Sequence, residues 1–460
     1  MKQVAIIGGG MAGLAAAHYL QQGARAQGID VEWRLFEQRD RLGGKVITDH
    51  EQGFVIEGGP DSFITQKPWG LALCRELGLD DELIPCNSAK QKVYILVRSR
   101  LCALPAGFRL TVPTRIMPFV KSPLFSWPAK LRMGMELFVP PRRDDGDESI
   151  SDFITRRLGR EAADKIGGPL MAGIYVADPA KLSLLSTFPM FRALERKHGS
   201  LIRAMRAAAK RPAAQTPMFM SLRGGMGRLI DVLRESLNER CTTDARITGL
   251  QMKGNRFELL KADGRETFDA VIIASPLYET AGLLQELAPE SAAVLRGIRY
   301  VSTGTVSLGY RLPLDGMDQK LDGFGFVIPA SEDRDLLACT WSSVKFEGRA
   351  PDGHALFRVF VGGERREHLA EAPDDELIAL VRRELRDILG LVSEPVVSRI
   401  YRWPKGNPQY DVGHADRMKA LMADIAKIPG LHLAGSGYNG IGLPDCIRSG
   451  KEAAEAVLRE

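Results

Sequence analysis

The N-terminal segment carries the pattern that most constrains the fold. Residues 2–7 are an apolar run typical of a buried strand, and three glycines follow it directly. An apolar helical pattern runs from Met11 to about Gln22, and a second strand is expected over 30–36. Strand, helix and strand in this order predict a βαβ unit, and therefore an α/β chain built on parallel strands.

The glycines of this segment stand at a spacing used for phosphate binding. Gly8, Gly10 and Gly13 form G-x-G-x-x-G between strand and helix, and Glu37 ends the second strand. Gly8 permits a tight turn, Gly10 admits a pyrophosphate close to the backbone, and Gly13 allows the helix to pack on the strand. The helix N-terminus then faces the phosphates, and Glu37 can accept hydrogen bonds from ribose hydroxyls. The segment predicts a dinucleotide site.

Two further glycine-rich segments favour a flavin dinucleotide over a nicotinamide one. Residues 37–45 (EQRDRLGGK) place a glycine pair and a lysine just after the ribose carboxylate, and residues 57–62 read EGGPDS. A nicotinamide domain has no use for this extra loop. A flavin does, because backbone must run beside its diphosphate and its ring.

Segments of the same domain recur far along the chain. Residues 219–229 lead into a helix, and strands are expected over 245–251 and 270–276, returning to the first sheet. Residues 431–450 read as a strand, a glycine-rich turn and a helix. We therefore expect a discontinuous Rossmann-like domain, formed by 1–85, 216–290 and 400–460.

The two inserted regions differ in pattern. Residues 86–215 are punctuated by prolines and helical in period, and within them Leu104–Pro141 mixes aromatic with basic side chains. That stretch suits a membrane-facing patch, the wall of an apolar cavity, or ordinary core packing. Residues 291–399 alternate apolar and polar positions as antiparallel strands do, so we expect an α+β substrate domain there.

The positive charge is concentrated in two segments. The chain has 62 basic and 57 acidic residues, yet Leu83–Met135 and Arg196–Ile230 contain no acidic residue and 17 basic ones. The remaining chain has 45 basic against 57 acidic residues and is mildly acidic. The two segments are either solvated faces or sites that attract an anion, such as a carboxylated substrate or an anionic membrane.

Several classes of protein are disfavoured. The six cysteines are widely spaced, which argues against a disulfide framework or structural zinc and for a reducing compartment. No apolar run reaches the length of a transmembrane helix, and the N-terminus lacks the features of a signal peptide. No nucleic-acid-binding motif accompanies the basic residues. We expect a cytoplasmic protein with no nucleic-acid partner.

Several motifs together resemble one family along essentially the whole chain. The opening glycine motif, E-x-x-x-R-x-G-G at Glu37–Gly44 and L-R-G-G at Leu222–Gly225 are similar to the flavin amine oxidase and protoporphyrinogen oxidase superfamily. Three segments resemble the bacterial porphyrinogen oxidases more closely: GGPDSF, PQYDVGH and GSGYNGIGLPDCI. The LPAG and GIYVADP segments, at 104–107 and 173–179, point the same way.

The resemblance implies FAD as the cofactor. It places the pyrophosphate on Gly8–Gly13, the adenosine ribose on Glu37, and the adenine against the backbone of Ile247. Trp403 is expected near the flavin ring, with an ordinary core position as the alternative. The residues expected to bind FAD are Gly8, Gly9, Gly10, Met11, Ala12, Gly13, Glu37, Gln38, Arg41, Gly44, Lys45, Gly59, Pro60, Asp61, Ser62, Ile247, Trp403, Ile441, Gly442 and Leu443.

The resemblance also implies a reaction. Such enzymes oxidise a porphyrinogen, a cyclic tetrapyrrole with propionate side chains, and pass the electrons from FAD to O2. Neither a metal nor a side-chain nucleophile is required. Coproporphyrinogen III is favoured by the C-terminal segment, and protoporphyrinogen IX stays open. Lys92 and Arg98 are expected to pair with propionates, and Ile174, Phe324 and Trp341 to contact the pyrroles, with structural roles as the alternative for each.

Other readings remain open. Peripheral membrane contact, transfer of product to a ferrochelatase, and a monomeric or homodimeric state are undecided. An oxidase of the same superfamily acting on an amine or a carotenoid precursor is a second hypothesis. Cys446 counts against it, because it lies in P-D-C-I and not in the S-G-G-C context of covalent-flavin amine oxidases. A non-catalytic flavin-binding scaffold is a third, and the intact 59–62 and 441–443 loops count against that one.

Overall fold

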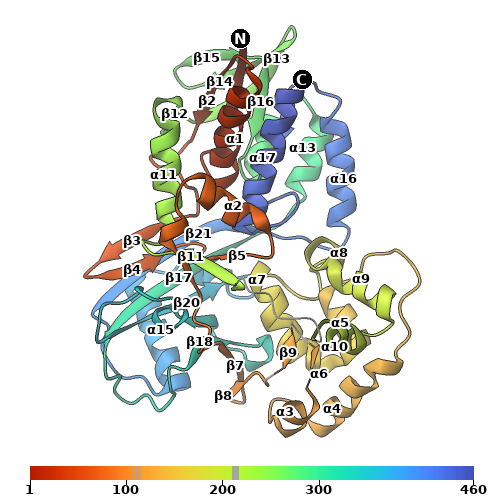
Figure 1. Cartoon of the computed structure of the whole chain (residues 1–460), viewed down its shortest axis with the longest axis vertical. Helices are drawn as coiled ribbons and strands as arrows, with labels where there is room; N and C mark the ends of the chain where they lie inside the picture. The colour runs from red at the N-terminus through yellow and green to blue at the C-terminus, as the bar shows by residue number, and fades with distance from the viewer. Residues whose placement is uncertain (106, 110–111, 114, 210–216) are drawn as a thin grey trace.

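The computed structural model describes residues 1–105, 107–109, 112–113, 115–209 and 217–460. Ala106 of the LPAG segment, and Lys210 and Arg211 of the second basic segment, lie outside these residues. The half of the molecule expected to bind the dinucleotide, called the nucleotide-binding half, carries both termini. A large sheet and a block of helices from residues 116–209, called the helical block, lie side by side below it in Figure 1.

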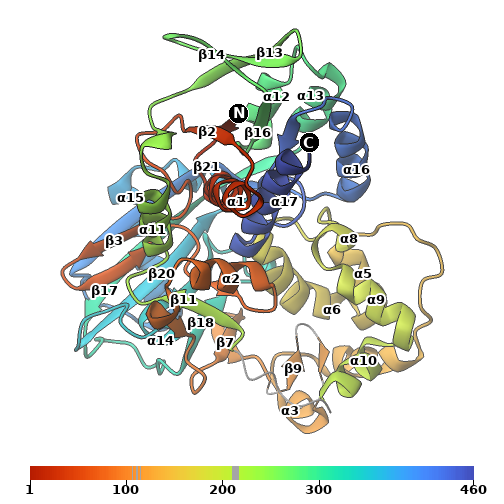
Figure 2. The ribbon, with the colours of Figure 1, turned by 45° about the horizontal axis from the view of Figure 1, so that its top comes forward.

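A five-stranded parallel sheet forms the centre of the nucleotide-binding half. Its helices begin after glycine-rich turns, and α1 (Met11–Gln27) and α17 (Leu443–Arg459) run side by side in Figures 1 and 2. A Cβ on Gly450 would lie 2.2 Å from the carbonyl oxygen of Ala12, so only glycine permits this approach. The strand order is β12-β2-β1-β16-β22, formed by Cys241–Thr242, Val31–Phe36, Lys2–Ile7, Ala270–Ile273 and Leu431–Leu433.

Helices cover both faces of this sheet, and its interior strand β16 (AVII) is accordingly apolar throughout. The apolar core on one face includes residues of α1, α17 and α11 (Gly227–Leu237). The other face packs against α12 (Leu277–Leu283), α13 (Pro289–Arg296) and α16 (His414–Ile425). The predicted βαβ opening and the α/β fold are confirmed.

One predicted strand joins a different sheet. The strand expected over 245–251 is β13 (Ile247–Lys253), which pairs with β14 (Arg256–Lys261) in an antiparallel sheet completed by β15 (Gly264–Phe268). The place beside β2 is taken by the short β12. β13 is exposed along one side, and such a strand suits an antiparallel sheet better than a parallel sheet covered on both faces.

A seven-stranded sheet forms the second half of the molecule. The antiparallel arrangement expected from the alternating pattern is confirmed, except that β18 and β7 run parallel. Helix α15 (Asp374–Leu389) packs on one face. The order is β21-β17-β20-β19-β18-β7-β8, from Val397–Pro408, Tyr300–Arg311, His354–Gly362, Leu336–Trp341, Gly323–Val327, Lys92–Val97 and Arg100–Ala103.

Sheet membership does not follow the expected boundaries of 86–215, 291–399 and 400–460. β7 and β8 come from the first insertion, and most of β21 lies beyond residue 400, yet all three belong to the large sheet. The buried run Tyr94–Leu96 lets β7 extend the sheet beside β18, a pairing between distant segments that local pattern cannot reveal.

Apart from a short strand pair, β9 (Phe108–Arg109) and β10 (Val112–Pro113), the described remainder of the first insertion is helical, as predicted, and packs around its own apolar core. A π-helix, η3, contains Gly167, Gly168 and Pro169, residues that disfavour regular α-helix. No helix in the described part of the chain is both long and apolar enough to cross a membrane. The helices are α3 (Ile116–Lys121), α4 (Trp127–Gly134), η2 (Met135–Phe138), α5 (Ile150–Leu158), α6 (Arg160–Ala162), η3 (Ala163–Ala172), α7 (Gly173–Tyr175), α8 (Leu184–Thr187), α9 (Pro189–His198) and α10 (Leu201–Ala209).

Candidate functional site

The turn between β1 and α1 is shaped for an anion. Gly8 has a positive φ of 109°, and a Cβ on Gly13 would lie 1.9 Å from the carbonyl oxygen of Gly8. Gly10 is the N-cap of α1, and neither a side-chain cap nor an acidic residue occupies the first turn. A Cβ on Gly10 would meet nothing within 4 Å. The uncapped N–H groups of α1 therefore open onto unfilled space, which suits a phosphate.

Glu37 lies at the carboxyl end of β2, beside this turn. Its carboxylate accepts hydrogen bonds from the N–H of Gly9 at 2.6 Å and the N–H of Arg39 at 2.9 Å. Its carbonyl accepts from the N–H of Ala245 at 2.8 Å, which brings the start of β13, and so Ile247, to the same edge. Each carboxylate oxygen retains acceptor capacity for a ribose hydroxyl. Gln38, the next residue, is exposed.

The second glycine pair lies against the first. The N–H of Gly43 donates to the carbonyl of Gly9 at 2.8 Å, and a Cβ on Gly44 would lie 3.0 Å from the Cα of Gly10. Arg41 donates to the carbonyl of Gly44 at 2.7 Å. Lys45 extends to the carbonyl of Gly406, at the end of the large sheet. The loop thus runs from the pyrophosphate turn to the other half of the molecule.

Residues 58–62 continue this path. A Cβ on Gly59 would lie 1.8 Å from the carbonyl oxygen of Lys45, so the two backbones are in contact. Asp61 forms an ion pair with Lys345 at 2.8 Å. Burial alone would raise the pKa of Asp61, but Lys345 and Arg358 outweigh it and hold that pKa well below its usual value. Ser62 donates to Asp61 at 2.7 Å.

A second helix begins beside the first. Strands β1 and β22 are parallel members of one sheet, so α1 and α17 start from the same edge. Gly442 is the N-cap of α17, Leu443 is buried, and Ile441 packs on the core of the helical block. Asp445 pairs with Lys67 at 2.6 Å. The α17 N-terminus therefore lies between the nucleotide-binding half and the helical block.

The arrangement fits FAD. Two helix N-termini, an acidic ribose acceptor and three glycine-rich backbone segments meet at one edge of a parallel sheet, where dinucleotides bind in such folds. Trp403 also comes to this edge, because its Nε1 donates to the carbonyl of Gly58 at 3.0 Å.

The five residues expected to contact substrate do not form one cluster, although Lys92 and Phe324 lie on the neighbouring strands β7 and β18. Lys92 pairs with Asp322, and Arg98 is exposed in the β7–β8 turn. Ile174 is 60% exposed on α7. Phe324 packs with Phe346 on one face of the large sheet, while Trp341 is 0% exposed within the core on the α15 face. Full burial leaves Trp341 no surface for a macrocycle, so its role here is packing.

Sequence reasoning missed a set of buried cations next to residues 57–62. Arg358 donates to the carbonyls of Gly58 and Gly59, and Arg349 donates to Ser221 at 2.7 Å and lies 3.7 Å from Glu57. Arg358 occupies an inward position of an otherwise apolar strand (ALFRVFV), and that was the available signal. Lys345, between two aromatic residues in space, carried no such signal.

Buried His414 gives a testable pH dependence. It stacks on Tyr410 with ring centroids 4.0 Å apart, and burial lowers its pKa from 6.5 to about 4. Between these values the unfolded chain binds a proton that the folded chain does not, so stability falls as the pH falls. We expect His414→Phe to remove up to about 1.4 kcal/mol per pH unit of this loss. Urea unfolding of both proteins between pH 7 and 4 measures it.

His18 and His432 are also buried with lowered pKa values, and they serve as the internal control because they titrate in both proteins. If the unfolding free energies of the wild type and His414→Phe change equally with pH across this range, His414 is not the source of the pH dependence.

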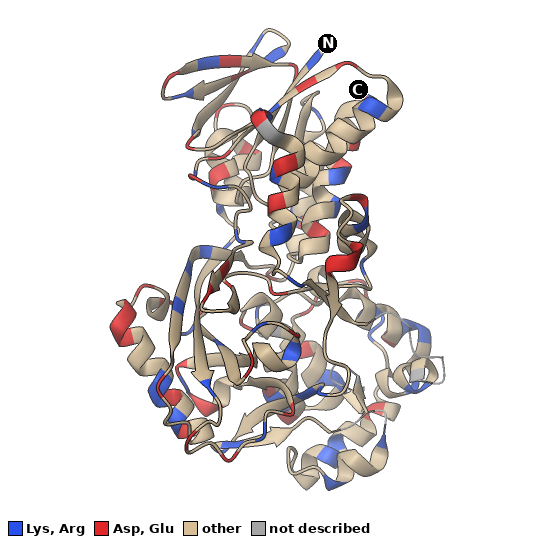
Figure 3. Cartoon of the chain, turned by 60° about the vertical axis from the view of Figure 1, so that its left-hand side comes forward, with Lys and Arg blue, Asp and Glu red and all other residues tan. Residues whose placement is uncertain are grey.

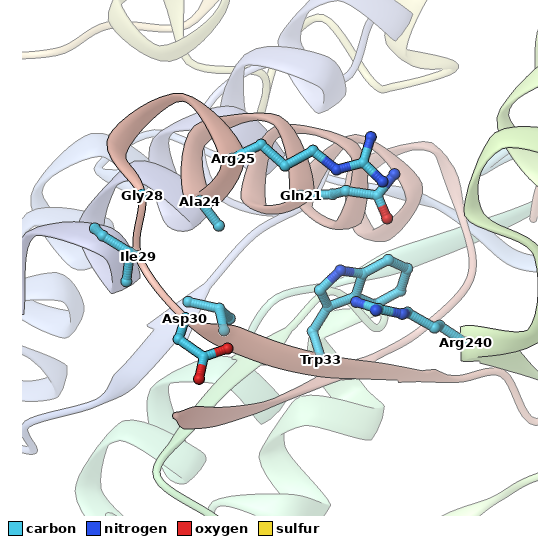
Figure 4. A pocket seen from close by; sticks show the side chains of 9 residues that line it. Gln21, Ala24, Arg25, Gly28, Ile29, Asp30, Trp33 and Arg240 are labelled. Atoms are coloured by element: carbon cyan, nitrogen blue, oxygen red, sulfur yellow. The ribbon is translucent and has the colours of Figure 1, made fainter.

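A separate cavity of about 260 Å³ lies between the C-terminal end of α1 and β2 (Figure 4). Gln21, Arg25, Trp33 and Arg240 line it. It borders the end of α1 opposite to Gly10, and no glycine-rich turn reaches it. It is therefore distinct from the candidate FAD site.

The fold and the site define an FAD-binding oxidoreductase. A family model for flavin containing amine oxidoreductases matches residues 11–458, and the chain belongs to this family. It is 35% identical to a coproporphyrinogen III oxidase of Bacillus subtilis over 99% of this chain and 98% of that protein. It is 37% identical to one of Propionibacterium freudenreichii, over 98% and 90% of the two chains.

Solved structures agree. The crystal structure of a candidate protoporphyrinogen oxidase from Exiguobacterium sp. 255-15 superimposes with a TM-score of 0.89 at 33% identity, covering 100% of this chain and 99% of that one. A putrescine oxidase, at 18% identity and a TM-score of 0.72, shares the fold over 100% of this chain and 99% of that one. The resemblance to porphyrinogen oxidases is confirmed.

Proposed function

We propose that this protein oxidises coproporphyrinogen III to coproporphyrin III, with O2 as the electron acceptor. The reaction removes six electrons and six protons from the substrate and reduces three O2 to three H2O2. One observation carries the proposal: identity of 35–37% with coproporphyrinogen III oxidases extends over nearly all of both chains. A chloroplastic and mitochondrial protoporphyrinogen oxidase of Arabidopsis thaliana reaches 28%.

The residues of the chain would hold and orient the cofactor. When bound, FAD supplies the redox chemistry by accepting two electrons per cycle. The α1 N-terminus and Gly10 would bind the pyrophosphate, and Glu37 the ribose. Residues 59–62 and the α17 N-terminus would fix the ring against the large sheet. We retain 1–85, 216–290 and 400–460 as the core of the FAD-binding domain, with β21 assigned to the sheet.

Substrate contacts would come from residues that remain accessible. Arg98 and Ile174 are exposed, so they can reach a propionate and a pyrrole respectively. Lys92 is less suited to propionate binding, because Asp322 already pairs with it. Phe324 is half-buried and would contribute only from one edge.

Aerobic turnover tests the proposal. Purified, FAD-loaded protein given coproporphyrinogen III should produce porphyrin fluorescence and H2O2, and putrescine should give neither. Porphyrinogen left unchanged by a fully loaded enzyme would contradict the proposal. If the bound flavin, once photoreduced, also fails to reoxidise in air, the scaffold hypothesis gains support instead.

The helical block carries an apolar surface for which we propose contact with an anionic membrane. Phe138 is 81% and Leu131 70% exposed on η2 and α4, at the end of the molecule opposite to the termini (Figure 1). Lys and Arg segments appear on these lower helices in Figure 3, matching the acid-free sequence. Apolar side chains with basic neighbours suit lipid headgroups. The exposed apolar residues are Ile116, Met117, Trp127, Leu131, Met135 and Phe138.

We expect the protein to cosediment with phosphatidylglycerol vesicles at low salt. The double variant Leu131→Glu, Phe138→Glu should bind vesicles about tenfold more weakly. It removes apolar side chains from the proposed contact surface and places two negative charges against anionic headgroups. Met190→Glu, an exposed apolar position on α9, is the matched control. Equal sedimentation of all three proteins would remove the membrane proposal.

The remaining proposals concern location and partners. A cytoplasmic protein would pass its porphyrin to a ferrochelatase, and it would be a monomer or a homodimer. Sedimentation equilibrium measures the oligomeric state. Transfer of product to the ferrochelatase, measured with an excess of a protein that captures free porphyrin, shows whether the transfer is direct.

A further inference from the structure

Three side chains from three strands converge on one carbonyl oxygen at the candidate site. The oxygen of Gly58 accepts from Trp403 Nε1 at 3.0 Å, from Arg358 Nη2 at 3.3 Å and from Thr305 Oγ1 at 3.3 Å. These donors lie on β21, β20 and β17. A carbonyl oxygen has two lone pairs, so three donors on one oxygen exceed what backbone satisfaction requires.

The other end of this peptide unit faces the opposite way. In a trans peptide the N–H of Gly59 points away from the carbonyl of Gly58. That N–H finds no acceptor in the described part of the chain. Hydrogen bonds to the carbonyl polarise the amide and make its N–H a stronger donor. The large sheet therefore strengthens a donor that is directed away from it, on the side where residues 59–62 border the FAD site.

Arg358 is 5% exposed and has no direct ion pair with a described carboxylate. The carboxylates of Asp61 and Glu57 act on its charge only from a longer distance. Asp61 pairs with Lys345, and Glu57 lies nearest to Arg349. The three cations beside residues 57–62 outnumber the two carboxylates there, so one buried positive charge stays in excess and favours a compensating anion. Residues 58 and 59 supply only carbonyl dipoles.

We infer that Arg358 and Trp403, acting through the Gly58–Gly59 peptide, are positioning residues that raise the reduction potential of the bound flavin. The isoalloxazine gains negative charge on reduction, and a buried cation behind a polarised N–H stabilises that charge more than it stabilises the neutral oxidised ring. The inference rests on FAD occupying this site and not on the identity of the substrate.

The test uses FAD-loaded protein without porphyrinogen. Arg358→Met should give a more negative midpoint potential and an affinity of the flavin for sulfite about tenfold or more lower, because sulfite binding also leaves negative charge on the ring. Arg358→Lys retains the positive charge, so it should keep most of the wild-type midpoint potential and most of the wild-type sulfite affinity. Trp403→Phe removes the Nε1–H donor while retaining an aromatic ring, and it should show a smaller change in the same direction.

Arg399→Met is the matched control, because Arg399 is a half-exposed cation of the same strand as Trp403, paired with Glu51. It should leave the potential and the sulfite affinity unchanged. If Arg358→Met does not retain FAD, the test rests on the potentials and sulfite affinities of Arg358→Lys and Trp403→Phe. Variants with altered thermal stability but a wild-type potential and sulfite affinity would show that these side chains only support the fold, and would overturn the inference.

Discussion

Replacing Gly10 by alanine should strongly weaken FAD binding without destabilising the apoprotein. Gly10 has φ −74° and ψ −178°, values that alanine adopts readily, and its Cβ would meet no protein atom within 4 Å. The apoprotein should therefore be as stable as the wild type, or about 0.5 kcal/mol more stable. The added methyl group would occupy the place where the pyrophosphate approaches the backbone, so we expect FAD affinity to fall on the order of 100-fold.

Two further variants serve as controls for this prediction. Gly13→Ala places its Cβ 1.9 Å from the carbonyl oxygen of Gly8, so it should destabilise the apoprotein as well as lose FAD. Gly134→Ala, in an open position at the end of α4, should leave FAD affinity unchanged and stabilise the apoprotein by about 0.5–1 kcal/mol. Fluorescence titration with FAD and urea unfolding of the apoproteins separate the two effects. Tight FAD binding by Gly10→Ala would show that the pyrophosphate does not pass this turn.

The second large effect is expected at a buried ion pair in the helical block. Arg157 and Glu136 are both 0% exposed and paired with each other. Glu136 also accepts from the N–H of Leu201 at 2.8 Å, so it caps α10. Arg157→Met would leave this carboxylate buried without its cation, and we expect the free energy of unfolding to fall by about 3–5 kcal/mol.

The comparison variant removes both charges. Arg157→Met combined with Glu136→Gln should recover at least about 1 kcal/mol, because no unpaired charge remains buried. Arg196→Met removes an exposed cation of α9 and should cost less than about 0.5 kcal/mol. Urea unfolding measures all three. A loss below about 1 kcal/mol for Arg157→Met would mean that water reaches the carboxylate.

The sequence was most informative where a backbone conformation requires one residue type. A positive φ requires glycine at position 8 and a 1.9 Å approach requires it at position 13, so a spacing rule could locate the candidate FAD site from these residues. The position of Glu37 follows from the same βαβ unit. Glycine-rich contacts are therefore predictable from local sequence.

The substrate side was less predictable, because it depends on which distant strands pair. Trp341 and Phe324 are both apolar residues in alternating segments, yet the sheet places them on opposite faces. The assignment of residues 245–251 to the first sheet was wrong for the same reason, since the two-residue β12 fills that place. Lys345 becomes recognisable only because α14 (Ser342–Lys345) places it against Asp61.

The most direct test compares two porphyrinogens on the purified, FAD-loaded protein in air. The initial rate of porphyrin fluorescence gives kcat/KM for coproporphyrinogen III and for protoporphyrinogen IX. We predict a value at least about tenfold higher for coproporphyrinogen III, with three H2O2 per porphyrin, since its additional carboxylates can meet the basic segments. A preference for protoporphyrinogen IX would contradict the proposed substrate, and oxidation of neither would contradict the proposed function altogether.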